Sequence, residues 1–308
     1  MIRNYLKLTV LIAFVAGIVS CNKGIDDSVD EQKILENENA IKKYIADSSF
    51  SAVRDSSGLY YSLSPNPTGV KPSLGDEVKV RYNAYLLNGT KVWTSEKDTS
   101  KFIKYPFFTN DQFVLPGIEL ALRLMRTGEK AKVFVPFYLG FYGKYEKPLT
   151  GYFTNPNIPE YSPIRIDLEL VSKSSELEQI NSYITQNKLT VSERTTDNLV
   201  LVKTTTVATG DTLGSDKSVK IKYTGKLLDG TVFDPGATPL AFITGAGRNN
   251  LIPGFDRGIR RLKTGEKAIL IIPSKLGYST SGQVNKEGTN FIIRPYQPIM
   301  FNVEVLPN

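Results

Sequence analysis

The residue types that perform most enzyme chemistry are scarce in this chain. Histidine is absent, and cysteine occurs once, at Cys21. Ser-His and Cys-His nucleophilic pairs, the usual zinc sites and the commonest general base are therefore excluded, and we expect no metal and no cofactor. Carboxylates are scattered, and nothing marks two of them as a pair for glycoside hydrolysis. Aromatic residues on short strand-like stretches are the stronger pattern, so the elements that carry them decide which site is formed.

One unit of the sequence occurs twice. VLPGIELALRLMRTGEKAKVFVP at 114–136 returns as LIPGFDRGIRRLKTGEKAILIIP at 251–273. Each copy predicts a short helix opened by Pro-Gly, a Thr-Gly turn and a strand that ends at proline. Apolar residues at i, i+3, i+7 and i+10 give each helix one buried stripe. The two stripes are Leu115, Ile118, Leu122 and Met125, and Ile252, Phe255, Ile259 and Leu262.

The duplication covers most of the chain. GDEVKVRYNAYLLNG at 75–89 matches KSVKIKYTGKLLDG at 217–230, and IPEYSPIRIDLELV at 158–171 matches IRPYQPIMFNVEVL at 293–306. Their alternating apolar residues predict half-buried antiparallel strands, with hairpin turns at Asn88-Gly89 and Asp229-Gly230. A helical preface precedes each copy, over Glu31 to Ala46 and after a capping box of Ser175 with Glu178. We therefore predict an α+β chain of two domains, 31–172 and 173–308.

The first twenty residues form a separate segment. Arg3 and Lys7 precede an apolar run that is too short for a confident membrane span and predicts a signal peptide over 1–20. The tetrapeptide Ile18-Val19-Ser20-Cys21 resembles a bacterial lipoprotein cleavage box, which implies a lipid on Cys21. The polar stretch that follows is predicted to be a tether over 21–30. Together they predict a lipid-anchored membrane protein of the cell envelope, facing the periplasm or the cell exterior.

The charge pattern argues against nucleic acid as a partner. The formal charge of +7 falls to +5 when the two cations of the leader are removed, and no long run of like charges occurs. The densest basic group is predicted to lie on the solvated side of the second helix. Its members are Arg257, Arg260, Arg261 and Lys263.

The second copy resembles the FKBP-type peptidyl-prolyl cis-trans isomerases. The motifs KIKYTGKLLDGTVFD, PLAF, LIPGFDRGI, LKTGEKAILIIP, LGYS and IMFNVEVL follow in order from Val219 to Leu306. The resemblance implies a bent antiparallel sheet wrapped around one short helix, with an X-Pro peptide bound in the apolar hollow between them. It also implies that macrolide-type ligands can bind to the second domain.

Isomerisation of an X-Pro bond suits a chain without histidine. Rotation requires no nucleophile and no proton transfer, only relief of a barrier of about 18–20 kcal/mol that amide resonance creates. An apolar hollow disfavours the charge-separated planar amide more than the twisted transition state, and this differential binding lowers the barrier.

The resemblance assigns roles to ten residues of the second domain. The predicted catalytic residues are Asp234 at the polar rim, Tyr278 as a hydroxyl donor and Phe255 as the floor. The predicted substrate-binding residues are Tyr223, Phe233, Phe242 and Phe301 as walls, the N–H of Ile252 as a donor, and Leu251 and Ile293 as sides. The family usually has tryptophan at the floor. For Tyr223, Phe242 and Phe301, plain packing in the sheet is the competing interpretation.

The first copy departs from this pattern. Alignment on the tyrosines places Trp93 at the position of Asp234, whereas a shift of one residue would place Thr94 there. Ile118, Phe141 and Ile166 replace Phe255, Tyr278 and Phe301, and either Tyr105 or Phe107 replaces Phe242. The first domain therefore lacks the carboxylate of Asp234 and the hydroxyl of Tyr278, and we expect catalysis in the second domain alone.

The sequence thus predicts a tandem prolyl isomerase that assists the folding of exported proteins and acts on proline-containing polypeptides. The alternative is a lipoprotein of the same fold that binds peptide or protein segments without turnover. Before the last strand each copy has a long segment, 142–157 and 279–292. The aromatic residues of the first one fit a partner surface or packing on its own domain equally well.

Overall fold

The computed structural model of the chain describes residues 27–66, 68–96, 102–107, 115–141, 152–153, 158–207, 209–245, 251–286, 288 and 291–307. The predicted signal peptide and Cys21 lie outside these ranges, as does most of the segment 142–157. None of the helices within the described ranges is long and apolar enough to cross a membrane.

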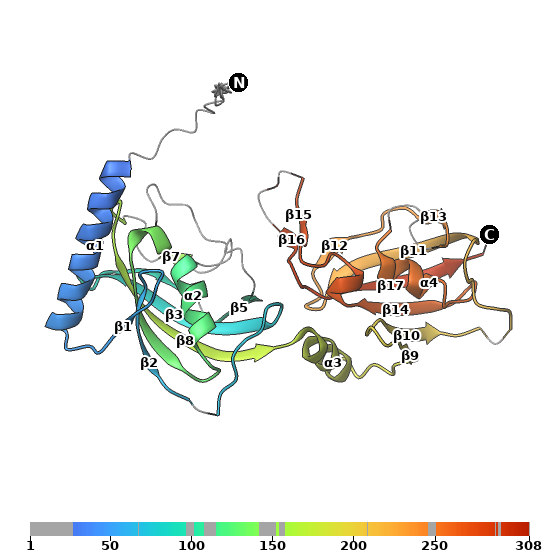
Figure 1. Cartoon of the computed structure of the whole chain (residues 1–308). Helices are drawn as coiled ribbons and strands as arrows, with labels where there is room; N and C mark the ends of the chain where they lie inside the picture. The colour runs from blue at the N-terminus through green and yellow to red at the C-terminus, as the bar shows by residue number, and fades with distance from the viewer. Residues whose placement is uncertain are drawn as a thin grey trace, which may run out of the picture.

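Two antiparallel sheets, each with its own short helix, follow one another along the chain (Figure 1). The first sheet consists of β1 (Val53–Arg54), β2 (Tyr60–Ser64), β3 (Glu77–Leu86), β4 (Lys91–Thr94), β5 (Ile103–Pro106), β6 (Lys130–Val135), β7 (Tyr152–Phe153) and β8 (Ile164–Ser174). The second consists of β9 (Glu193–Arg194), β10 (Val200–Thr205), β11 (Ser218–Leu227), β12 (Val232–Asp234), β13 (Leu240–Ile243), β14 (Lys267–Ile272) and β17 (Ile299–Leu306). A separate hairpin is formed by β15 (Gln283–Val284) and β16 (Phe291–Ile293).

The strand order shows that the duplication is structural. The first sheet runs β1-β2-β6-β8-β3-β4-β7 with β5 paired to β3, and the second runs β12-β11-β17-β14-β10-β9 with β13 paired to β11. Apart from β7, each strand of the first sheet has a counterpart with the same neighbours in the second. The predicted α+β class and the pair of sheet-and-helix domains are confirmed.

A short helix packs on each sheet, α2 (Pro116–Leu124) in the first domain and α4 (Pro253–Ile259) in the second. Both begin with proline followed by glycine. A Cβ added at Gly117 would lie 2.6 Å from Cγ1 of Val135, and one at Gly254 would lie 2.4 Å from Cγ2 of Ile272. The glycine therefore lets each helix approach the sheet closely, which brings its apolar stripe into the core.

The two preface helices are α1 (Asp27–Asp47) and α3 (Glu176–Gln186). The predicted capping box of Ser175 with Glu178 is present. The side chain of Asn37 in α1 accepts from the N–H of Phe137, which opens the 3-10 turn η1 (Phe137–Leu139), over 3.1 Å. Glu176 in α3 likewise accepts from the N–H of Ser274, which opens η2 (Ser274–Leu276). Each preface helix is therefore attached to the same turn of its own domain.

Two predicted boundaries differ from the structure. Helix α1 begins at Asp27, so the last four residues of the predicted tether 21–30 are helical. Strand β8 continues through the predicted boundary at 172/173 to Ser174, which pairs with Glu77. No flexible linker separates the domains here, because Ser175 directly caps α3.

Candidate functional site

The ten predicted site residues come together where α4 packs on the second sheet. Four of them, Phe242, Phe255, Ile293 and Phe301, are buried members of the second core cluster. Five others pack against that cluster as partly buried side chains, namely Tyr223, Phe233, Leu251, Ile252 and Tyr278. Asp234 is joined to them through a hydrogen bond with Tyr223.

Phe255 lies at the centre of the aromatic group. Its ring centroid lies 4.8 Å from that of Phe301, 5.7 Å from that of Tyr223 and 6.4 Å from that of Phe242. Phe233 meets Phe301 edge to face, with centroids 5.5 Å apart. Edge-to-face pairs of this kind are favourable beyond the area they bury. The position of Phe255 is thus compatible with its predicted role as the floor.

Glycine at position 225 makes room for two of the rings. A Cβ at Gly225 would lie 2.7 Å from Cε2 and Cζ of Phe233 and 2.9 Å from Cε1 of Phe301. Gly225 is not among the residues predicted from the sequence. Comparison of the two copies could have identified it, because the first copy has Ala84 at the corresponding position.

The polar rim is organised by Asp234. Tyr223 donates its hydroxyl to Oδ2 of Asp234 over 2.9 Å, and the N–H of Gly236 donates to Oδ1 over 3.0 Å. Burial, followed by the hydrogen bond to Asp234, raises the pKa of Tyr223 to about 12. The pKa of Tyr278 is also raised, first by burial and then by the charge of Asp234. Both phenols therefore remain neutral hydroxyl donors at physiological pH.

The helix entrance forms the remaining side. Ile252 is the N-cap of α4, and its carbonyl accepts from the N–H of Phe255 over 3.1 Å. Its own N–H precedes the helix and takes no part in the hydrogen bonds within it. Leu251 and Ile252 are partly exposed, whereas Ile293 is fully buried. The arrangement thus combines apolar walls with a few donors at the edge.

Strand register resolves the two uncertain positions in the first domain. Tyr82 and Tyr223 are equivalent, and two residues later Ala84 pairs with Trp93 while Gly225 pairs with Asp234. Four residues before each tyrosine, Val78 pairs with Tyr105 and Val219 pairs with Phe242. Trp93 therefore takes the place of Asp234, and Tyr105 takes the place of Phe242.

The equivalent place in the first domain is a packed core. Trp93 and Tyr82 are both 0% exposed, and their ring centroids lie 4.6 Å apart. Phe141 meets Trp93 edge to face at 6.3 Å. In the second domain Tyr223 and Asp234 are partly exposed at the equivalent positions. The first domain thus has a packed core where the second has an accessible rim.

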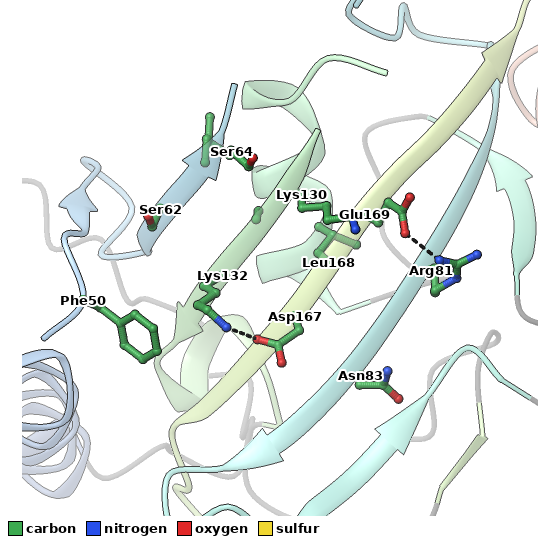
Figure 2. Close-up of a pocket in the computed structure, with 12 residues that line it drawn as sticks. Phe50, Ser62, Ser64, Arg81, Asn83, Lys130, Lys132, Asp167, Leu168 and Glu169 are labelled. Carbon is green, nitrogen blue, oxygen red and sulfur yellow. Dashed lines mark hydrogen bonds and ion pairs between the residues drawn. The ribbon is translucent and has the colours of Figure 1, made fainter. Parts of the chain in front are cut away.

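A different hollow of about 530 Å³ lies on the outer face of the first sheet, away from α2 (Figure 2). Four of its charged side chains form pairs between neighbouring strands, Arg81 with Glu169 at 2.8 Å and Lys132 with Asp167 at 3.5 Å, and Lys130 also lines it. Phe50 borders it, with the ammonium group of Lys132 5.1 Å from its ring centroid. None of the predicted site residues lines this hollow.

Each domain is thus an antiparallel sheet packed on one short helix, and the second has an aromatic cluster with hydroxyl donors at its edge. The model of the FKBP-type peptidyl-prolyl cis-trans isomerase family matches residues 69–171 and 210–306. The chain therefore belongs to this family and contains its domain in tandem.

Several relatives of the chain are eukaryotic proteins. Human peptidyl-prolyl cis-trans isomerase FKBP9 is 26% identical over 308 residues, covering 97% of this chain and 46% of the human protein. FK506-binding protein 2 of Yarrowia lipolytica is 40% identical over 92 residues, covering 29% of this chain and 58% of that protein. The crystal structure of the three FKBP domains of wheat FKBP73 is 26% identical, with a TM-score of 0.37, covering 83% of this chain and 98% of that one. The chain spans less than half the length of the human relative.

Proposed function

We propose that the second domain catalyses cis-trans isomerisation of X-Pro bonds in polypeptides. The observation that carries the proposal is the aromatic cluster around Phe255, with the Tyr223–Asp234 pair at its edge, in a member of this family. Proline would occupy the aromatic hollow, where the planar amide loses hydration and the twisted one loses less. The N–H of Ile252 and the hydroxyl of Tyr278 would hold substrate carbonyls.

Asp234 would orient the peptide that the aromatic residues bind. Because Asp234 accepts from both Tyr223 and Gly236, its carboxylate is held in one position at the mouth of the hollow. Fixed dipoles at the edge favour the twisted amide without reorganising during the reaction. Proline-containing polypeptides are therefore the proposed substrates, and macrolide-type ligands are proposed to compete for the same hollow.

The direct test is a protease-coupled assay with the full chain on an X-Pro tetrapeptide. The chain is expected to accelerate the slow cis-to-trans phase in proportion to its concentration. Peptide binding without acceleration would instead support the alternative, a non-catalytic binding protein of the same fold. A chain that neither binds nor accelerates would contradict both.

We further propose that the protein is a lipoprotein of the cell envelope that assists folding of exported proteins. The support is the leader of residues 1–20, with Arg3 and Lys7 before an apolar run and Cys21 after a small residue. Peptide-bond isomerisation uses no cofactor and no nucleotide, so it suits a compartment outside the cytosol. The first domain, with its filled hollow, would add structure or partner contacts rather than turnover.

The variant Cys21→Ser is expected to move the protein from the membrane to the soluble fraction without altering its unfolding temperature. One acyl chain binds a membrane only marginally, so firm anchoring implies more than one chain on the mature terminus. Fractionation without detergent measures this, with Ser20→Ala as a control that keeps the cysteine and a small residue before it. A serine variant that still sediments with membranes would contradict the lipid anchor.

A further inference from the structure

The segment before the last strand of the second domain reaches the first domain. Phe291 and Tyr296 pack against the core cluster of the first domain. The ring of Tyr296 covers Gly75, since a Cβ added there would lie 2.8 Å from Cδ1 of that ring. Arg294 donates from Nη1 to the carbonyl of Lys104 over 3.3 Å. Figure 1 shows the β15–β16 hairpin on the side of the second domain that faces the first.

The same segment contains one of the two residues that are predicted to form the sides of the candidate site. Ile293, between Phe291 and Arg294, is 0% exposed and belongs to the core cluster of the second domain. Burial lowers the pKa of Arg294, and the charges of Glu77 in the first domain and Asp229 in the second oppose that shift. One short stretch of chain is thus attached to both domains at once.

The repeat shows that this attachment is particular to the second copy. Tyr161 and Tyr296 are equivalent in the repeat and have the same unusual backbone, with φ of 57° and 58°. In the first domain the ring of Tyr161 meets Phe137 at 5.1 Å, and its carbonyl accepts from Asn37 of α1. The first copy thus attaches to its own preface helix, whereas the second attaches to the preceding domain. Left-handed backbone at a bulky residue persists only where its surroundings hold it.

We infer that the first domain positions the active hollow of the second. By holding Phe291, Arg294 and Tyr296, it fixes the segment that carries Ile293 and so preorganises one side of the proline site. These three are positioning residues, and the inference rests on the proposed function of the second domain. It gives the first domain, in which Trp93 is buried at the position of Asp234, a role in the reaction.

Two glycines of the first domain provide a matched test in the full chain. Gly75 and Gly89 have φ of +90° and +91°, so alanine strains both backbones equally. The surroundings differ, because a Cβ at Gly75 meets Tyr296 and one at Gly89 has nothing within 4 Å. Unfolding followed by the fluorescence of Trp93, the only tryptophan of the sequence, checks that both variants destabilise the first domain alike.

Gly75→Ala is expected to accelerate amide hydrogen exchange at residues 291–297 by about tenfold or more, whereas Gly89→Ala leaves it unchanged. It should also raise KM for an X-Pro peptide about three- to tenfold, with kcat changed less than about twofold, because a loosened wall must be ordered on binding. Equal exchange at 291–297 in the two variants, or an unchanged KM in Gly75→Ala, would overturn the inference.

A second pair of variants, at Tyr296, tests the same inference without straining the backbone of the first domain. Tyr296→Ala should reproduce the faster exchange and the higher KM, and Tyr296→Phe, which keeps the ring on Gly75, should restore both. If the wild-type chain binds the peptide without isomerising it, the proposed catalysis fails, and the peptide dissociation constant replaces KM in the same comparison. A dissociation constant that both tyrosine variants leave unchanged would overturn the inference separately.

Discussion

Asp234→Val is expected to lower kcat/KM of the full chain on an X-Pro peptide by about ten- to hundredfold, which corresponds to about 1.4–2.7 kcal/mol of transition-state stabilisation. The substitution removes the carboxylate that accepts from Tyr223 and Gly236. It therefore releases the hydroxyl of Tyr223 and eliminates the fixed charge at the mouth of the hollow. The protease-coupled assay measures the loss, and the split between KM and kcat shows whether binding or turnover is affected.

Stability should change little in the same variant. Asp234 and Tyr223 are partly exposed, so water can replace the lost hydrogen bond, at a cost of about 1 kcal/mol. Tyr223→Phe is the matched control, because it breaks the same hydrogen bond and keeps the carboxylate. It should retain more activity than Asp234→Val if the charge itself matters. Tyr278→Phe should also lower activity without unfolding the domain, and unchanged turnover in all three variants would remove them from the site.

Phe255→Ala is expected to have the largest combined effect. The side chain is 3% exposed and meets three other rings, so its removal should lower the free energy of unfolding of the second domain by about 3–5 kcal/mol. Activity should fall as well, because the floor of the proline hollow is lost. Circular dichroism during urea titration measures the stability, and the isomerase assay measures activity under conditions where the domain stays folded.

The matched control for Phe255→Ala is Ile118→Ala. Ile118 occupies the equivalent position on α2 and is 0% exposed, so its truncation should cost about 2–5 kcal/mol in the first domain. Because Trp93 lies in the first domain, Ile118→Ala should shift the fluorescence transition and Phe255→Ala should leave it in place. An activity loss in folded Ile118→Ala as large as that in folded Phe255→Ala would contradict the assignment of the floor.

Much of this fold could be predicted from internal comparison. Two copies of the same apolar spacing located the strands, the Pro-Gly helix starts and the hairpin turns, because local periodicity and turn chemistry determine those features. The capping box at Ser175 was predicted for the same reason. The start of α1 was predicted less well, because it lies at Asp27 and not at Glu31. A short polar stretch is compatible with a tether and with the first turn of a helix.

For the candidate site, the sequence predicts a set of residues but not how they are arranged in space. Sequence left Trp93 and Thr94 as alternatives at the rim of the first domain, and only the pairing of Ala84 with Trp93 decided between them. Sequence also could not show that Trp93 packs against Tyr82 in the core of the first domain, because that contact depends on tertiary packing around both rings. Tyr161 and Tyr296 occupy matching motifs with different contacts, so their roles depend on tertiary packing alone.

The division of labour between the domains is tested most directly by separating them. Residues 27–174 and 175–308 follow the structural boundary, with Ser175 retained as the cap of α3. Both fragments would be assayed on the same X-Pro peptide under identical conditions, after thermal unfolding has shown that each is folded. Removal of the first domain from the second is expected to raise KM, so kcat is the quantity to compare.

The fragment 175–308 is expected to keep a kcat within about threefold of that of the full chain, while the folded fragment 27–174 should accelerate isomerisation at least about a hundredfold less. The reason is the contrast between the partly exposed Tyr223–Asp234 pair of the second domain and the fully buried Tyr82 and Trp93 at the equivalent positions of the first. Comparable turnover by the folded fragment 27–174, or a folded but inactive fragment 175–308, would contradict the assignment of catalysis to the second domain.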